Sequence, residues 1–319
     1  MLEHINLTWA AQQQRKPLPA VALNHLRSCT FNECDFDFAF HLLEHLTLPI
    51  DILLCINDSS CDGELYEHPE RFPIPPLSLC QDLAFMELSL FEESIHWTAN
   101  NTQSTSGFLF NGNDNDRWIR WVEVPHAALP YSQIQVLHLH VDEELSEISR
   151  LATHILPRFV HLQELGLLAM YYRGETDRPL VLQREVLSAL SQSDPVVCPE
   201  LRVLIWQTDV SYDEFPFSEL MEMTATRFHA GRPLARFVYQ LNKGHFDDEE
   251  SHKRFSHSIS SLSAFVDCPE YLHSDEEKLC PFKMRECWKI LEAEKYWLVP
   301  RKRTDRRPKY LLQWDDSED

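Results

Sequence analysis

Glycine is scarce in this 319-residue chain, and its seven glycines cannot build the common phosphate-binding loops. No two of them lie two positions apart, so the G-x-G-x-x-G turn of dinucleotide-binding proteins is absent. Gly107 and Gly112 have the spacing of a Walker loop, but Asn113 stands where that loop needs lysine. The G-x-S-x-G nucleophile elbow is also missing. The sequence therefore contains none of these nucleotide-binding or hydrolase motifs.

Basic side chains are also few, with 29 Lys and Arg against 50 Asp and Glu and a formal net charge of −21. This surplus repels phosphate backbones and anionic lipid, so we expect neither a nucleic-acid nor a membrane partner. No apolar run approaches the roughly 18 residues of a membrane span, and residues 1–4 have no signal-peptide character. We therefore expect a cytoplasmic or nuclear protein. The nuclear location is included because the basic stretch 301–309 would permit nuclear import.

The nine cysteines are scattered and form no C-x-x-C pair. A chain of this length does not need disulfides to hold its core, so reduced thiols are expected. Cys29 with Cys34 and Cys280 with Cys287 are conceivable ligand pairs, but neither has a second pair at zinc spacing. We therefore expect no bound metal and no cofactor.

A pattern of apolar residues at positions 1, 4 and 6 recurs along the chain. Its copies are Leu2/Ile5/Leu7, Leu26/Cys29/Phe31, Ile50/Leu53/Cys55, Leu83/Met86/Leu88, Ile134/Leu137/Leu139, Leu162/Leu165/Leu167, Leu201/Leu204/Trp206 and Leu234/Phe237/Tyr239, with a degraded ninth copy at Leu262/Phe265. Successive copies begin 24, 24, 33, 51, 28, 39, 33 and 28 residues apart. Positions 4 and 6 share one face of a short strand, because side chains alternate between the two faces.

Helical periodicity separates several of these copies. Apolar residues recur at steps of three and four over 35–46 and 143–159, and segments 181–190 and 215–228 are similar. One strand and one helix per repeat is the leucine-rich-repeat design, in which each unit buries its apolar face against the next. We therefore predict an α/β fold, a curved leucine-rich-repeat solenoid over residues 1–268 with parallel strands on the concave face and helices on the convex face.

Two regions depart from this pattern. Alternating residues at about 90–125 predict a β-rich insertion, with a hairpin turn signal at Asn111, Gly112 and Asn113. Residues 269–300 are predicted to form a C-terminal capping segment with a helix at 281–297, and residues 301–319 a charged tail.

Three segments resemble the repeat region of the F-box-like proteins abundant in mushroom-forming fungi. They are residues 198–204 (CPELRVL), 217–223 (FSELMEM) and 42–49 (LLEHLTLP). The resemblance covers most of residues 2–268 and is one of apolar spacing, without a Leu-Pro-x-Glu helical box ahead of the first copy. It implies a substrate-recognition region that feeds a cullin-type ubiquitin ligase, with the Skp adaptor as a possible partner if an F-box lies upstream.

The strand register predicts which side chains reach the concave face. Ile52, Leu54 and Ile56 are assigned to that face with the apolar residues of later strands. The predicted partner-binding residues are His138, His140, Glu164, Leu168, Val203, Ile205, Gln207, Arg236, Val238 and Gln240. Alternatively, the insertion or the C-terminal segment folds over this face and makes these residues part of the core. A protein partner of this acidic chain would be neutral or basic.

Three groups of residues admit an enzymatic alternative. His41, Glu44 and His45 match the H-x-x-E-H zinc-peptidase motif, although their helical positions also suit a solvated face. His138 and His140 with Asp142 could chelate a metal or seat a base, and Cys198 or Cys268 could act as a nucleophile. We expect a non-catalytic protein-interaction module. A free-standing repeat scaffold and a zinc-dependent hydrolase are the alternatives.

Overall fold

A computed structural model describes residues 3–8, 19–32, 34, 36–49, 51–57, 82–91, 94–102, 106–112, 131–142, 151–170, 181–208, 215–241 and 249–272. The chain divides into two compact units, residues 1–283 and 284–319, and every described residue belongs to the first. The expected helix at 281–297 and the expected tail at 301–319 lie outside the described residues.

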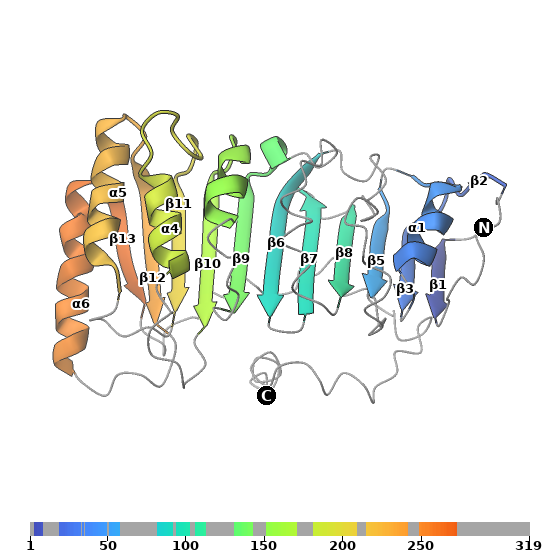
Figure 1. The fold of residues 1–319 in the computed structure, drawn as a ribbon, viewed down its shortest axis with the longest axis horizontal. Coiled ribbons are helices and arrows are strands. Elements are labelled where there is room, and N and C mark those ends of the chain that lie inside the picture. Colours follow the sequence, from blue (N-terminus) through green and yellow to red (C-terminus); the bar gives the residue numbers. More distant parts are fainter. Residues whose placement is uncertain are drawn as a thin grey trace. The chain divides into compact units, whose positions relative to one another are not determined.

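The described residues contain thirteen β-strands. They are β1 (His4–Thr8), β2 (Val21–Ala22), β3 (Ser28–Asn32), β4 (Leu46–Thr47), β5 (Leu53–Asn57), β6 (Leu83–Phe91), β7 (Ser94–Asn101), β8 (Gly107–Gly112), β9 (Val136–Asp142), β10 (Glu164–Met170), β11 (Val203–Thr208), β12 (Leu234–Leu241) and β13 (Val266–Leu272). Eleven of them form one mostly parallel sheet in the order β1-β3-β5-β8-β7-β6-β9-β10-β11-β12-β13 (Figure 1). The short strands β2 and β4 pair separately.

Strands β8 and β7 lie between β5 and β6, and of these β7 interrupts the parallel order (Figure 1). β7 is antiparallel to both β6 and β8, whereas β8 is parallel to β5. β-Structure was expected at about 90–125, and β7 and β8 lie in the first part of this range. Of the expected turn, Asn111 and Gly112 are the last two residues of β8, and residues 113–130 lie outside the described part of the chain.

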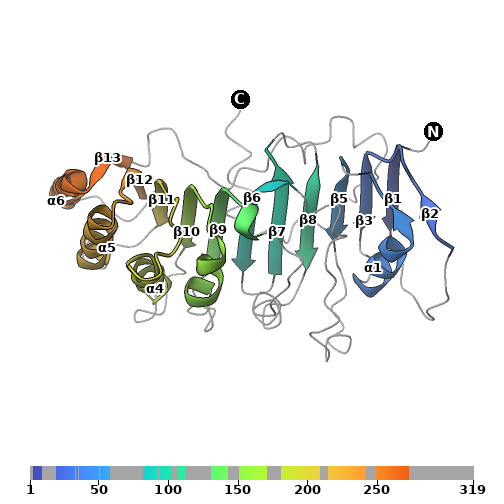
Figure 2. The same cartoon turned by 90° about the horizontal axis from the view of Figure 1, so that it is seen from above.

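Helices lie on one face of the sheet (Figure 2). They are α1 (Phe36–Glu44), α4 (Val181–Leu190), α5 (Phe217–His229) and α6 (Glu249–Ser261), with the short helical turns η4 (Tyr131–Gln133), η5 (Leu151–Ile155), η6 (Leu156–Arg158) and η7 (Leu262–Ala264). Helices were expected at 35–46, 181–190 and 215–228, and the structure has helices there. Of the helix expected at 143–159, the described residues 151–158 form η5 and η6, and residues 143–150 lie outside the described part of the chain. Helix α6 was not anticipated.

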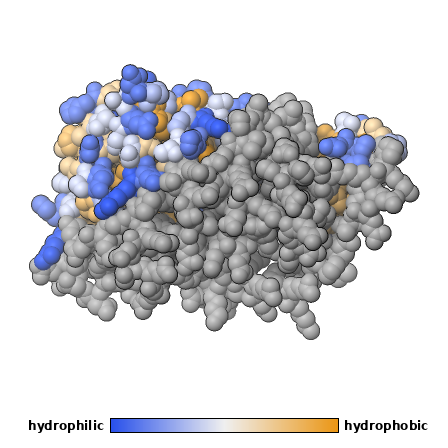
Figure 3. Space-filling model, viewed as in Figure 1, coloured by the Kyte–Doolittle hydropathy of each residue, from blue (hydrophilic) through white to orange (hydrophobic). Residues whose placement is uncertain are grey.

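Helix α5 illustrates why these segments are helical. Leu220, Met223, Thr224 and Arg227 are buried at helical spacing, so they form one continuous face toward the sheet. The helix starts after Pro216, whose fixed φ suits a first turn, and the chain leaves it through Gly231 at φ +71. On the outer surface over α4, α5 and α6, hydrophilic residues predominate (Figure 3).

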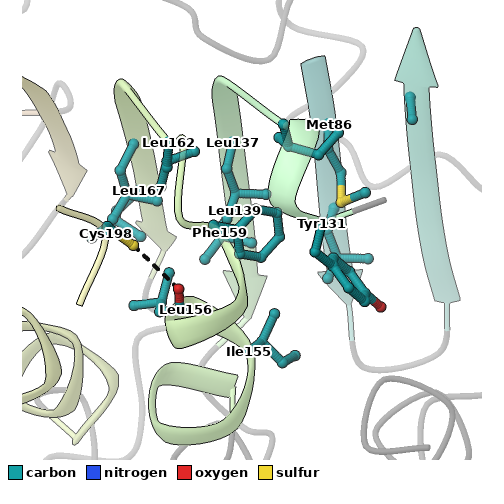
Figure 4. Close-up of a cluster of buried hydrophobic side chains, with 14 of the residues drawn as sticks. Met86, Tyr131, Leu137, Leu139, Ile155, Leu156, Phe159, Leu162, Leu167 and Cys198 are labelled. Atoms are coloured by element: carbon teal, nitrogen blue, oxygen red, sulfur yellow. Dashed lines mark hydrogen bonds between the residues drawn. The ribbon is translucent and has the colours of Figure 1, made fainter. Parts of the chain in front are cut away.

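The core lies between the sheet and these helices. Neighbouring parallel strands align their apolar positions, as in the row Met86, Leu137, Leu165, Leu204 and Phe237, and all of these side chains are buried. Figure 4 shows Leu137, Leu139 and Leu167 pointing toward Ile155 and Leu156. At the other end, Tyr239 contacts Phe215 of the preceding loop and Phe255 of α6, with ring centroids 4.8 and 4.3 Å apart.

Two copies of the apolar pattern were assigned to the wrong register. In β5 the core-facing residues are Leu54 and Ile56, which pair with Cys29 and Phe31 and are fully buried. The assignment of Ile52, Leu54 and Ile56 to the concave face was therefore wrong, as was the third copy at Leu53 and Cys55. In the ninth repeat Val266 pairs with Leu234, so this strand begins four residues later than Leu262.

Candidate functional site

We call the sheet surface opposite the helices the helix-free face, because no helix among the described residues lies on it (Figure 2). Strand register arranges its side chains in three rows that cross β6, β9, β10, β11, β12 and β13. The first row is Phe85, Val136, Glu164, Val203, Arg236 and Cys268; the middle row is Glu87, His138, Gly166, Ile205, Val238 and Glu270; the third row is Ser89, His140, Leu168, Gln207, Gln240 and Leu272.

All ten residues predicted to bind a partner fall in these rows, but they differ in exposure. Seven are buried, each with less than a tenth of its surface exposed: His138, His140, Leu168, Ile205, Gln207, Val238 and Gln240. The other three, Glu164, Val203 and Arg236, are partly exposed and all belong to the first row. The accessible part of the predicted site is therefore the first row, where strands β9–β12 begin.

Sequence reasoning missed three polar residues on this face. Glu270, and the place of Cys268 on this face, were missed because the ninth copy of the apolar pattern was assigned four residues too early. Glu87 lies between two core positions of β6, and the alternation rule applied to β9 would also have located it. Glu270 and Cys268 extend the accessible surface to β13 at the edge of the sheet.

His138 occupies a fitted position in the middle row. Its Nε2 lies 3.0 Å from Glu164 Oε1, and its ring meets Phe85 edge-on with centroids 5.2 Å apart. Gly166 on the adjacent strand makes room for this ring, because a Cβ there would lie 2.6 Å from His138 Cδ2. The His138 ring is thus positioned by the Glu164 carboxylate and the Phe85 ring, and it occupies the space that a side chain at position 166 would fill.

An ion pair forms the β13 end of the face. Arg236 donates from Nε and Nη2 to the two carboxylate oxygens of Glu270, at 2.8 Å each, and the Cys268 thiol donates to Glu270 at 3.2 Å. Hydrogen bonds from Arg236 lower the pKa of Glu270, and the same pairing raises the pKa of the Arg236 guanidinium. The bidentate geometry fixes the direction of both side chains.

The surroundings of Cys268 and Cys198 raise the pKa of their thiols, whereas activation of a cysteine nucleophile requires a lowered pKa. The hydrogen bond to Glu270 raises the pKa of Cys268, and burial raises the pKa of Cys198 to about 12. Both thiols therefore stay protonated at neutral pH, whereas a catalytic cysteine needs its thiolate. Nearby, the Cys198 thiol donates to the carbonyl oxygen of Leu156 at 3.2 Å (Figure 4).

Among the described residues, the other candidate metal ligands do not form a complete site. His41 and His45 have ring centroids 5.0 Å apart and are partly exposed on α1 and just after it, and Glu44 is exposed beside them. Within the described ranges, no three His, Cys, Asp or Glu side chains gather as a metal site. The Asp142 side chain, expected near His138 and His140, lies outside the described atoms.

No known protein family, curated protein or solved structure matches this chain. Among the described helices none is long and apolar enough to cross a membrane.

Proposed function

We propose that the chain is a non-catalytic protein-interaction module with a leucine-rich-repeat architecture, and that the first row of the helix-free face contacts its partner. The observation that carries the proposal is the contrast between the two sheet faces. One face is covered by α1, α4, α5 and α6, whereas the first row of the other face keeps apolar and charged side chains partly exposed in register. Val136 and Val203 supply apolar contact, and Glu164, Arg236 and Glu270 supply polar contacts around them.

The repeat architecture is supported by the regular register of the parallel strands. From β9 to β12, each core-facing apolar residue pairs with the equivalent residue of the next strand, and a helix or helical turn precedes β10, β12 and β13. Such stacking gives each unit contacts mainly with its neighbours and leaves one extended sheet face for recognition.

The partner is a neutral or basic protein surface. A net charge of −21 repels acidic partners and attracts basic ones over a distance set by ionic strength. In and beside the first row, the two carboxylates Glu164 and Glu270 accompany one guanidinium, that of Arg236. By the resemblance of its repeats, the module would recognise substrates for a cullin-type ubiquitin ligase, and a free-standing scaffold is the alternative role.

Site-specific photo-crosslinking tests the binding surface. A benzophenone amino acid is placed at Val203 in one variant and at Ser188, exposed on α4, in a matched control. Irradiation in cells should give a discrete adduct from Val203 and none from Ser188. Adducts from Ser188 alone, or equal labelling at both positions, would refute the assignment of the binding surface to the helix-free face.

Two further measurements separate the roles. Co-expression with a Skp adaptor should yield a complex if the ubiquitin-ligase role is correct, and its absence beside a control F-box protein that does bind would leave the free-standing scaffold. Metal analysis of the purified chain should find no stoichiometric zinc. Zinc at one equivalent that is lost on His41→Ala would instead support the hydrolase alternative.

A further inference from the structure

The two edges of the 11-stranded sheet differ in how their backbone groups are protected. Alternate residues of each strand bond to alternate neighbours, as the N–H of Val203 donates to Gln163 and that of Arg236 to Arg202. If the same alternation continues into β13, the backbone N–H and C=O groups of Cys268 and Glu270 face β12, and the backbone of Pro269 faces the outer edge of the sheet. Proline has no N–H to offer an incoming strand, and the exposed Asp267 beside it adds a charge.

The opposite edge, β1, has neither protection. Its sequence His4, Ile5, Asn6, Leu7 and Thr8 contains no proline and no acidic or lysine residue. Because the carbonyl of Glu3 accepts from Ser28, alternation turns the backbone of Ile5 and Leu7 toward β3 and that of His4, Asn6 and Thr8 outward. β1 is therefore a receptive edge for strand addition.

The apolar side chains of β1 are incompletely covered. Ile5 and Leu7 are partly exposed, whereas Cys29 and Phe31, at the same positions of β3, are fully buried. Among the described strands, β3 lies between β1 and β5, whereas β1 pairs with β3 alone. A strand beside β1 would cover Ile5 and Leu7 and supply the missing contacts.

An asparagine ladder also ends at this edge. Asn57 donates from Nδ2 to Asn32 Oδ1 at 2.7 Å, and Asn32 donates from Nδ2 to Asn6 Oδ1 at 3.2 Å. Both hydrogen bonds run toward β1, and continuing the series past Asn6 requires its Nδ2 to donate to a strand that pairs with β1. The incoming strand must present a carbonyl acceptor there, and a second asparagine has one.

We propose that β1 pairs with β1 of a second copy of this chain, in an antiparallel two-fold arrangement centred on Asn6. Head-to-tail addition is disfavoured because the β13 edge carries Pro269, so the remaining symmetric contact joins two β1 edges. Centred on Asn6, the pairing sets Ile5 beside Leu7 of the partner subunit and brings the two Asn6 amides together. The two sheets then form one continuous sheet, and both ladders meet at the dyad.

The sequence of β1 suits this self-contact in spite of the chain's large net charge. The five residues carry no acidic side chain, so the repulsion between copies is long-range and screened by salt. A five-residue edge buries less surface than a standard interface, so association is expected in the micromolar range. Raising salt from about 0.05 M to about 0.5 M should strengthen it.

Sedimentation of the 319-residue chain between about 1 and 100 µM tests the dimer. The wild type should shift from monomer toward dimer over this range. Asn6→Pro should weaken association at least about tenfold, because it removes the outward N–H and the side-chain amide at the dyad while leaving the backbone bonds to β3 in place. Asp267→Pro, at an outward position of β13, is the matched control and should behave as the wild type. A wild type that stays monomeric, or an Asn6→Pro variant that dimerises normally, overturns the proposal.

Disulfide crosslinking gives a readout that does not depend on the proline variant folding. Asn6→Cys places two thiols at the dyad in directly opposed positions, whereas His4→Cys leaves them about 13 Å apart along the strands. Mild oxidation should therefore crosslink Asn6→Cys rapidly and His4→Cys no faster than the wild type. Equal crosslinking of both variants, or none in either, overturns the two-fold pairing, as does capture of β1 by a strand of a different protein.

Discussion

Arg227 donates from Nη2 to the carbonyl oxygen of Cys198, with the two atoms 3.0 Å apart inside the core. The same guanidinium reaches the carbonyls of Val197 at 3.0 Å and Leu201 at 3.3 Å. One side chain in the last turn of α5 thus satisfies three carbonyls of the loop that leads into β11. Burial lowers the pKa of this guanidinium because it disfavours the charged form. The three carbonyl acceptors offset part of that cost.

Replacing Arg227 should destabilise the fold through the loop that leads into β11. Arg227→Ala removes three hydrogen bonds to buried carbonyls, of which that of Cys198 keeps the N–H of Leu201, and opens a cavity. We therefore expect a loss of about 3–5 kcal/mol in the free energy of unfolding. Arg227→Lys should recover only part of this, because an ammonium cannot match the planar fork. Urea unfolding followed by circular dichroism measures both. Arg184→Ala, at an exposed ion pair with Glu219, is the control and should change stability by less than about 1 kcal/mol. A loss below 1 kcal/mol in Arg227→Ala would contradict the assigned role.

The buried thiols should make stability fall at alkaline pH. Burial raises the pKa of Cys29 and of Cys198 to about 12, whereas an unfolded thiol titrates near about 8.5. Below pH ~8.5 both states hold the proton and the stabilisation is complete. As pH rises toward 12 only the folded state keeps it, so each thiol loses about 1.4 kcal/mol of stability per pH unit.

Comparison of two truncations isolates this effect from other titrating groups. The difference in unfolding free energy between the wild type and Cys198→Ala should shrink as pH rises from about 8.5 to about 10.5. The difference for Val197→Ala, a neighbouring buried residue without a titratable group, should stay constant. Parallel pH profiles for the two variants would show that the Cys198 proton is not held by the fold.

The fit between Gly166 and His138 predicts a context-dependent substitution. Gly166→Ala would bring a methyl group to 2.6 Å from His138 Cδ2 and displace the ring from Glu164 and Phe85, so we expect a loss of about 1–3 kcal/mol. In a His138→Ala background the methyl group has space, and the same change should cost less than about 0.5 kcal/mol. Urea unfolding of the four proteins of this cycle measures the coupling. Equal costs in both backgrounds would mean that the ring does not occupy the space beside Gly166.

The sequence permitted prediction of those strands where apolar residues alternate cleanly. In β9 and β10, polar or small residues separate Leu137 from Leu139 and Leu165 from Leu167, so only one face could be the core. In β5 the run Ile52, Leu53, Leu54, Cys55 and Ile56 is apolar on both faces, and alternation cannot distinguish two registers one residue apart. The true first position of that copy is Asp51, a polar residue that the pattern rejected.

The sequence predicted which residues lie on the helix-free face, but not how exposed each of them is. Alternation identified the residues that share a face with His138 and Arg236, because register propagates from strand to strand. Burial of His138 and exposure of Arg236 depend on contacts between segments distant in sequence, which spacing does not encode. The pairing of Arg236 with Glu270 was missed because β13 contains a proline and breaks the apolar pattern.

The register of β5 can be tested by truncating two adjacent leucines. Leu54 is fully buried on the helix-covered face and Leu53 is partly exposed on the other. Leu54→Ala should therefore cost about 2–5 kcal/mol in the free energy of unfolding, and Leu53→Ala less than about 1.5 kcal/mol. The two substitutions remove the same atoms, so their difference reports the environment alone. Urea unfolding with unchanged m-values measures it. The register suggested by the apolar pattern requires the reverse order, and a larger loss at Leu53 would place Leu53 and Cys55 in the core.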